Sequence, residues 1–209
     1  MELFLCLRFN FLVSSMQINK TYITLIACAL INTNAQDKTD AIKHDNRSST
    51  KIIQTYRFDE LLDDGSYTIK IENLSSNINI LGHEGSGAKV VIRNIAQVIT
   101  EQEAQEAYEH SKTIVKNFKD EEVIHIIGNN DKVQSLEMEN FIDLSLPRNI
   151  NLEINLLGGD ISLDNTHGES ILETLGGDIN IDNHGGRTDT KTNGGDIKIN
   201  KVNGVFKGH

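Results

Sequence analysis

The sequence predicts a mainly β protein whose C-terminal part is a parallel β-solenoid with 18-residue coils. The tract at residues 157–165 recurs at 175–183 and at 193–201, so the offset is 175 − 157 = 193 − 175 = 18 residues. Glycines half a coil further on recur at the same interval, namely Gly168, Gly186 and Gly204. Upstream of the repeat, short stretches alternate apolar and polar residues, which is the pattern of half-buried strands. A short fixed period with glycine at each corner is typical of a solenoid.

Each coil is expected to add its residues to ladders along the solenoid, because neighbouring strands lie about 4.8 Å apart. Two apolar ladders are expected to point inward, and they consist of Ile161, Ile179 and Ile197, and of Leu163, Ile181 and Ile199. The opposite wall is expected to be smaller and more polar, with Ser170, Leu172, Thr188, Thr190, Phe206 and Gly208. The aliphatic residues come as one pair per coil, a pattern that fits neither a hexapeptide helix nor a calcium-binding roll.

Residues 55–149 are predicted to form an N-terminal β-rich part that carries one amphipathic α-helix. Five stretches alternate apolar and polar residues, at 67–72, 77–80, 89–93, 122–127 and 141–146. Apolar residues at three- and four-residue spacing instead predict a helix over about residues 101–118. Thr100 and Glu103 form a capping box at its start. Pro147 is expected to end the last strand of this part, because proline has no N–H to donate to a sheet.

The N-terminal residues 1–35 are predicted to be a secretion signal. Lys20 supplies the positive charge, residues 22–31 the apolar stretch, and residues 33–35 a small-residue cleavage site. Met16 is an alternative first residue of the chain. The following segment, residues 36–54, is polar and mixed in charge and predicts a flexible linker before the folded part. Repeats of the solenoid then occupy residues 150–209.

The cysteine at position 28 leaves two interpretations of the leader open. Residues 25–28 resemble a bacterial lipobox, in which Cys28 becomes the lipidated first residue of the mature protein. Cleavage after Ala35 is the other interpretation. It would remove both cysteines of the chain, Cys6 and Cys28, and would leave no thiol for a disulfide, a metal site or nucleophilic catalysis.

The expected mature chain is acidic. Cleavage after residue 35 removes Glu2, Arg8 and Lys20, so 20 − 2 = 18 basic and 30 − 1 = 29 acidic residues remain, a formal charge of 18 − 29 = −11. A negative surface repels nucleic-acid backbones and anionic lipid headgroups. We therefore expect no nucleic-acid partner, and contact with a membrane only through lipidation or a protein partner.

A ladder of acidic residues is the candidate ligand site, and it consists of Asp160, Asp178 and Asp196. Stacked carboxylates could attract calcium or a basic partner, or could perform acid/base chemistry in a polysaccharide-cleaving β-helix. The favoured interpretation is that each aspartate bonds the backbone of its own glycine turn. The histidines lack zinc-ligand spacing and the serines lack a nucleophile elbow, so no catalytic, cofactor-binding or metal-binding residues are predicted.

The order of these motifs resembles the adhesin-like family of bacterial β-strand-repeat proteins, a domain of unknown function, over residues 58–209. The residues that carry the resemblance are Ile69, Ile71, Glu72 and Asn73, then 77–80, 82–85 and 90–92, the expected helix, 142–149, and the tandem Gly-Gly-Asp-Ile repeats. The resemblance implies a right-handed solenoid, export to the cell envelope, and a role in adhesion or envelope sensing without catalysis. The sequence stops at the end of a third coil without a polar cap, so we expect a C-terminally truncated product.

Three functions are compatible with the sequence. A non-catalytic, adhesin-like module of the cell envelope, secreted, periplasmic or on the cell surface, would present its repetitive face to a glycan or an envelope protein. An envelope-stress or regulatory component would instead bind a membrane partner. A carbohydrate-active β-helix enzyme is the third and least favoured hypothesis. We expect the first of these, with no enzymatic activity and no cofactor.

Overall fold

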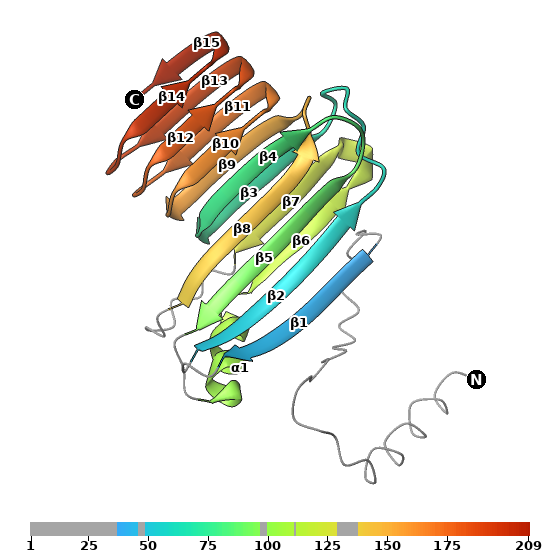
Figure 1. Ribbon diagram of the computed structural model, residues 1–209, viewed down its shortest axis with the longest axis vertical. Helices are drawn as coiled ribbons and strands as arrows, with labels where there is room; N and C mark the ends of the chain where they lie inside the picture. Colours follow the sequence, from blue (N-terminus) through green and yellow to red (C-terminus); the bar gives the residue numbers. More distant parts are fainter. Residues whose placement is uncertain (1–36, 46–48, 97–99, 111, 129–137) are drawn as a thin grey trace, which may run out of the picture.

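The protein is mainly β and consists of two mixed sheets that pack face to face (Figure 1). The computed structural model describes residues 37–45, 49–96, 100–110, 112–128 and 138–209. The predicted secretion signal and Cys28 lie outside these residues. Within them, one α-helix, α1 (Glu101–His110), and one 3₁₀ turn, η1 (Lys119–Glu121), accompany the strands.

The first sheet, called sheet A, contains eight strands in the described part of the chain. In spatial order they are β1 (Asp37–Asp45), β2 (Ser49–Phe58), β5 (Ala88–Ala96), β8 (Met138–Pro147), β4 (Asn77–His83), β10 (Ile161–Asp164), β12 (Ile179–Asp182) and β14 (Ile197–Asn200). The pairs from β1 to β8 are antiparallel, and those from β8 to β14 are parallel.

The second sheet, called sheet B, contains seven strands among the described residues. In spatial order they are β15 (Asn203–Gly208), β13 (Gly185–Thr192), β11 (His167–Thr174), β9 (Asn151–Gly158), β3 (Thr68–Ser75), β7 (Val123–Gly128) and β6 (Thr113–Phe118). The β6–β7 pair is antiparallel and the other pairs are parallel. Both sheets thus change from antiparallel to parallel pairing along the same direction.

From β9 onward the chain alternates between the two sheets, and the partner of each residue lies 18 positions away. In sheet A, Ile161 pairs with Ile179 and Ile179 pairs with Ile197. In sheet B, Ser170 pairs with Thr188 in the same way. The predicted 18-residue repeat is therefore the register of the parallel ladders, and Figure 1 shows these strands as a regular stack at the C-terminal end.

The core lies between the sheets and follows the predicted inward positions. Ile161 and Ile179 are fully buried, and Leu163 and Ile181 are almost fully buried. Ser170, Leu172, Thr188 and Thr190 are also fully buried, so the second predicted wall is confirmed in these coils. In the last coil Ile199 is 39% and Phe206 37% exposed, because β14 and β15 have a strand neighbour on one side only among the described residues.

The predicted helix over 101–118 is wrong in its second half. Helix α1 ends at His110, and Thr113–Phe118 forms strand β6, which pairs antiparallel with β7. Thr113, Val115 and Asn117 are buried in alternation, which is the strand period. Of the apolar residues predicted on the helix face in this tract, Val115 is buried, whereas Phe118 is 40% exposed. The β-branched residues Ile114 and Val115 favour the strand. The capping box is confirmed, since Glu103 N donates to Thr100 Oγ1 at 3.2 Å and Thr100 N donates to Glu103 Oε2 at 3.2 Å.

The segment expected to be a flexible linker, residues 36–54, contains β1 and most of β2 instead. Strand β2 buries every second residue, and the buried set is Thr50, Ile52, Gln54, Tyr56 and Phe58. Thr50 and Gln54 occupy two of these inward positions, so the alternation of apolar and polar residues is interrupted although the alternation of burial is not.

The two parts predicted at residues 55–149 and 150–209 share their sheets. Strand β4 pairs with β10, with Ile78 opposite Ile161, and β3 pairs with β9, with Ile69 opposite Leu152. Strands β3 and β4 therefore supply the layer beneath the first repeat, although β5 to β8 intervene in the sequence. The five strands predicted in this part are confirmed as β3, β4, β5, β7 and β8, and Pro147 ends β8.

Candidate functional site

The predicted aspartate ladder lies at the corner where the chain passes from sheet B to sheet A. A Gly-Gly-Asp turn forms this corner in each coil, and its second glycine has positive φ, with values of 103° at Gly159, 131° at Gly177 and 155° at Gly195. A Cβ atom at Gly177 would lie 2.3 Å from the carbonyl oxygen of Gly159 in the preceding coil. Only glycine permits this backbone angle and this approach of neighbouring coils.

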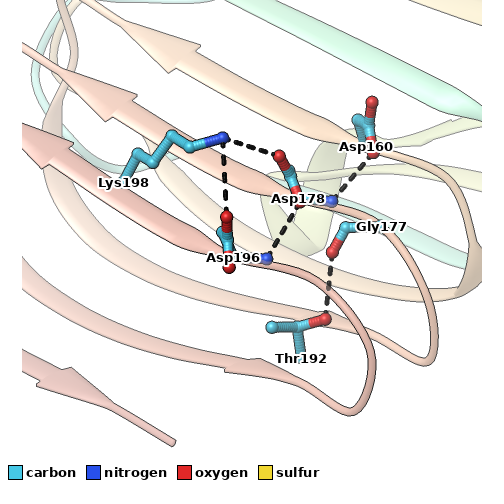
Figure 2. Close-up of polar contacts among 6 residues, drawn as sticks. All are labelled: Asp160, Gly177, Asp178, Thr192, Asp196 and Lys198. Atoms are coloured by element: carbon cyan, nitrogen blue, oxygen red, sulfur yellow. Dashed lines mark hydrogen bonds and ion pairs between the residues drawn. The ribbon is translucent and has the colours of Figure 1, made fainter.

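The aspartates bond one another along the stack (Figure 2). Asp178 N donates to Oδ1 of Asp160 at 2.8 Å, and Asp196 N donates to Oδ1 of Asp178 at 2.9 Å. The carboxylates of Asp160 and Asp178 thus accept the N–H of the next coil, and the expectation that they bond their own glycine turns is wrong. Charge-assisted hydrogen bonds of this kind connect successive coils at the corner.

The ladder also has a first member that the repeat does not contain. Asn77, at the start of β4, accepts a hydrogen bond from Asp160 N on its Oδ1 at 3.0 Å. The sequence indicates that Asn77 takes the place of a ladder aspartate, since Asn77-Ile78-Asn79-Ile80 matches the Asp-Ile-Asn-Ile tract that begins at Asp178. An asparagine can replace the aspartate because the bond requires only a side-chain oxygen.

A lysine from the last coil binds the ladder. Lys198 Nζ lies 2.8 Å from Oδ2 of Asp178 and 3.9 Å from Oδ2 of Asp196 (Figure 2). The N–H of Asp196 and the ammonium group of Lys198 both lower the pKa of Asp178 below its ordinary value. The carboxylate of Asp178 is therefore an ionised structural acceptor, which argues against a role as a general acid.

Threonines hold the same corner from the sheet B side. Thr192 Oγ1 donates to the carbonyl oxygen of Gly177 at 3.0 Å (Figure 2), and Thr174 Oγ1 donates to that of Gly159 at 3.0 Å. These residues were missed in the sequence, although a Thr-x-Gly-Gly-Asp tract recurs at Thr174 and Thr192. The corner is thus fixed both by the aspartates and by the threonines.

Asparagines fix the opposite corner. Asn165 and Asn183 have φ of 55° and 49°, the left-handed conformation that asparagine adopts more readily than most residues. Asn183 Nδ2 donates to Asn165 Oδ1 at 2.9 Å, and Asn165 Nδ2 donates to the carbonyl oxygen of Gly82 at 2.8 Å. A third such bond runs from Asn200 Nδ2 to Asp182 Oδ1 at 3.0 Å.

Between these corners, the outward side chains of sheet A form a field that we call the outer ladder face. Its twelve residues lie in three rows: Asn77, Asp160, Asp178 and Asp196; Asn79, Ser162, Asn180 and Lys198; and Leu81, Asp164, Asp182 and Asn200. Five of these side chains are aspartates and one is a lysine. The face is negatively charged and rich in short hydrogen-bonding groups.

Sheet B presents a different outer face, on which acidic side chains contact a lysine, an arginine and a histidine. Lys70 Nζ lies 3.2 Å from Glu153 Oε1, and His125 Nε2 lies 2.9 Å from Glu72 Oε1. Arg187 Nε lies 3.7 Å from Glu169 Oε1 in the coil stack. The excess of negative charge on the outer ladder face is therefore a property of sheet A and is not matched on sheet B.

Two further findings concern only the described residues. In these ranges, no group of three or more His, Cys, Asp or Glu side chains is placed to hold a metal ion. Across the same part of the chain, no helix is both long and apolar enough to span a membrane.

Comparisons with known proteins assign the chain to no family. No family model matches it, and no curated protein matches it. Among solved structures, a "putative cell adhesion protein" from Clostridium sporogenes ATCC 15579 aligns over 75% of this chain and 98% of that chain, with 12% sequence identity and a TM-score of 0.37. This similarity is below the level at which folds can be equated, so the family resemblance remains an expectation from the sequence motifs.

Proposed function

We propose that the protein is a non-catalytic, adhesin-like module of the cell envelope that binds a glycan or protein partner through the outer ladder face. In this proposal the stack of β9 to β15 is a right-handed parallel β-solenoid that serves as the rigid support of that face. The 18-residue register of the parallel pairs supports the solenoid assignment. Repetitive stacks of this kind suit binding because they offer extended regular surfaces.

The observation that carries the proposal is the fixed arrangement of hydrogen-bonding groups on the face. Asp178 is held by Asp196 N and Lys198, and Asp182 by Asn200, so several side chains already occupy one conformation. Ordering long or flexible side chains on binding costs about 0.5–1.5 kcal/mol for each. A face that is ordered beforehand avoids much of this cost, which favours binding of a partner.

The charge of the face restricts the partner. Five carboxylates and a single ammonium group repel polyanions such as uronic-acid polymers and nucleic acids. Hydroxyl-rich neutral glycans, amine-bearing glycans and basic protein surfaces are the ligands that can pair with aspartate and asparagine oxygens. Export to the envelope belongs to this proposal as well, and the leader-like pattern of residues 20–35 supports it.

The test is a binding screen with two matched variants. Asn180 lies at the centre of the outer ladder face and Asn155 on the exposed side of β9 in sheet B, and neither side chain makes a hydrogen bond in the structure that a substitution would remove. Tyrosine is favoured in strands, so Asn180→Tyr and Asn155→Tyr should both fold. The wild-type chain is screened against neutral, amine-bearing and uronic-acid glycans and against envelope proteins.

We expect binding to a neutral or amine-bearing glycan or to a basic envelope protein. Asn180→Tyr should weaken this binding at least about tenfold, and Asn155→Tyr should leave it unchanged. Equal loss in both variants would place the binding surface elsewhere. Binding to none of these ligands would contradict the proposal as a whole.

A further inference from the structure

A histidine is enclosed inside the coil stack beside a buried threonine. His184 lies at the corner between β12 and β13, and it is 1% exposed. The 18-residue register places it above Thr166, which is also buried, and below Val202, which packs against the core. An aromatic ring with two polar nitrogens thus stands where the neighbouring coils have a threonine and a valine.

The hydrogen bonds of this histidine are incomplete. Its Nδ1 atom lies 2.8 Å from Oγ1 of Thr166, but its Nε2 atom is enclosed without a hydrogen-bond partner. On the adjacent wall, Oγ of Ser170 and Oγ1 of Thr188 are also enclosed without partners. Leaving a buried polar group unpaired costs about 1–3 kcal/mol, so these three groups destabilise the closed stack.

Protonation of the ring would add a charge to this interior. Burial, followed by the nearby charge of His167, lowers the pKa of His184, and a weaker interaction with the backbone of Gly168 opposes this only in part. His167 is the titratable group that faces His184 from β11. Asp182 on the same coil and Lys201 on the next coil have side chains that reach solvent, so neither compensates a buried imidazolium.

The inner face of sheet B near His184 buries little apolar surface, so little hydrophobic stabilisation opposes the separation of its strands. The inward residues that pair across the coils become less apolar from β9 to β13. They are Leu152 and Ile154 in β9, Ser170 and Leu172 in β11, and Thr188 and Thr190 in β13. All six are buried. Since each buried aliphatic side chain contributes about 1.5–3 kcal/mol, the stabilisation of sheet B decreases from β9 to β13.

We infer that His184 is an acid-sensitive latch, which holds the last coils closed while its ring is neutral and releases β13 to β15 when the ring is protonated. The imidazolium needs water, and the turn that carries it can reach water if β13 separates from β11. Local opening of this kind draws on the less stable parts of a structure, and sheet B has fewer buried aliphatic side chains in β13 than in β9. The inference depends on the interior of the stack and is independent of the proposed binding face.

The direction of the pH effect follows from proton linkage. His184 binds a proton less readily in the closed stack than in the open state, whose pKa is near the ordinary value of 6.5. The closed state is therefore fully stable above about pH 6.5 and loses stability as the pH falls below it. One unit lower, at about pH 5.5, the population of the open state can rise up to about tenfold.

Hydrogen exchange at pH 7.5 and at pH 5.5 tests the latch, with amide protection corrected for the intrinsic exchange rate. In the wild-type chain, protection in β13 and β15 should fall several-fold at pH 5.5, while protection in β3 and β9 should not change. Two variants copy the residues that neighbour His184 in its own ladder, namely His184→Thr and His184→Val. Both should keep their protection between the two pH values, whereas the control His125→Gln, on the outer face of sheet B, should behave as wild type.

An NMR titration of the histidine rings gives a second measurement that needs no variant. The ring of His184 should remain neutral until β13 loses its protection, so both changes should share one midpoint. A ring that titrates at its ordinary pKa while β13 stays protected would overturn the inference. Acid-induced loss of protection that persists in both His184 variants would overturn it as well.

Discussion

The carboxylate of Asp178 accepts the backbone N–H of Asp196, 18 residues further along the chain, at 2.9 Å. An acidic side chain that looks like a ligand for a cation is therefore an acceptor for the next coil. The same bond links Asp160 to Asp178, and Asn77 continues it into the layer below. The most conspicuous feature of the repeat thus has a structural role, and any binding role belongs to the wider face around it.

Two substitutions of Asp178 separate its hydrogen bond from its charge. Asp178→Asn keeps an oxygen that can accept Asp196 N–H but loses the ion pair with Lys198, whereas Asp178→Ala loses both. We expect the melting temperature to decrease in the order wild type, Asp178→Asn, Asp178→Ala. Equal melting temperatures for the two variants would show that the inter-coil hydrogen bond contributes nothing.

The contribution of the Asp178 charge should depend on pH. Asp196 N–H and then Lys198 lower the pKa of Asp178 below 3.8 in the folded chain, so the unfolded chain binds this proton more readily. The stabilisation is therefore present above about pH 3.8 and is lost as the pH falls through the lower folded pKa. The difference in melting temperature between wild type and Asp178→Asn should be larger at pH 7 than at pH 2, and a constant difference would contradict this assignment.

Adjacent glycines at the corner should differ in their tolerance of alanine. Gly177 has φ of 131°, and a Cβ atom there would lie 2.3 Å from the Gly159 carbonyl oxygen. Gly177→Ala should lower the free energy of unfolding by at least about 2 kcal/mol. A Cβ atom at Gly176 would meet nothing within 4 Å, so Gly176→Ala should change it by less than about 0.5 kcal/mol. Urea denaturation measures both, and a similar loss for the two would rule out the predicted steric cause.

Neighbouring residues of β11 test which face of the strand lies in the core. Leu172 is fully buried, and Leu172→Ala should cost about 2–5 kcal/mol through lost burial and a cavity. Ile171 is 42% exposed on the outer side of sheet B, so Ile171→Ala should cost less than about 0.5 kcal/mol. A larger loss for Ile171→Ala would mean that the outer side of β11 is covered in solution. Equilibrium denaturation at pH 7.5 compares the two variants.

The repeat could be predicted from the sequence because its contacts are regular. Partners such as Ile161 and Ile179 lie one coil apart, so a fixed offset in the sequence becomes a fixed neighbour in the sheet. The pairing of Ile78 with Ile161 spans β5 to β8 and has no fixed offset, and it therefore escaped prediction. Strand β2 escaped for a different reason, because its inward Thr50 and Gln54 are polar.

The sequence by itself determined the 18-residue coil, the inward position of Ile161 and Ile179, and the capping box of Thr100 and Glu103. Each of these depends on residues that are close in sequence or regularly spaced, so local geometry is sufficient. Tertiary structure alone decided that residues 113–118 form a strand and that Asp160 and Asp178 each bond the coil above. A short segment gains most of its stability from the neighbours that it pairs with, and those neighbours exist only once the two sheets have assembled.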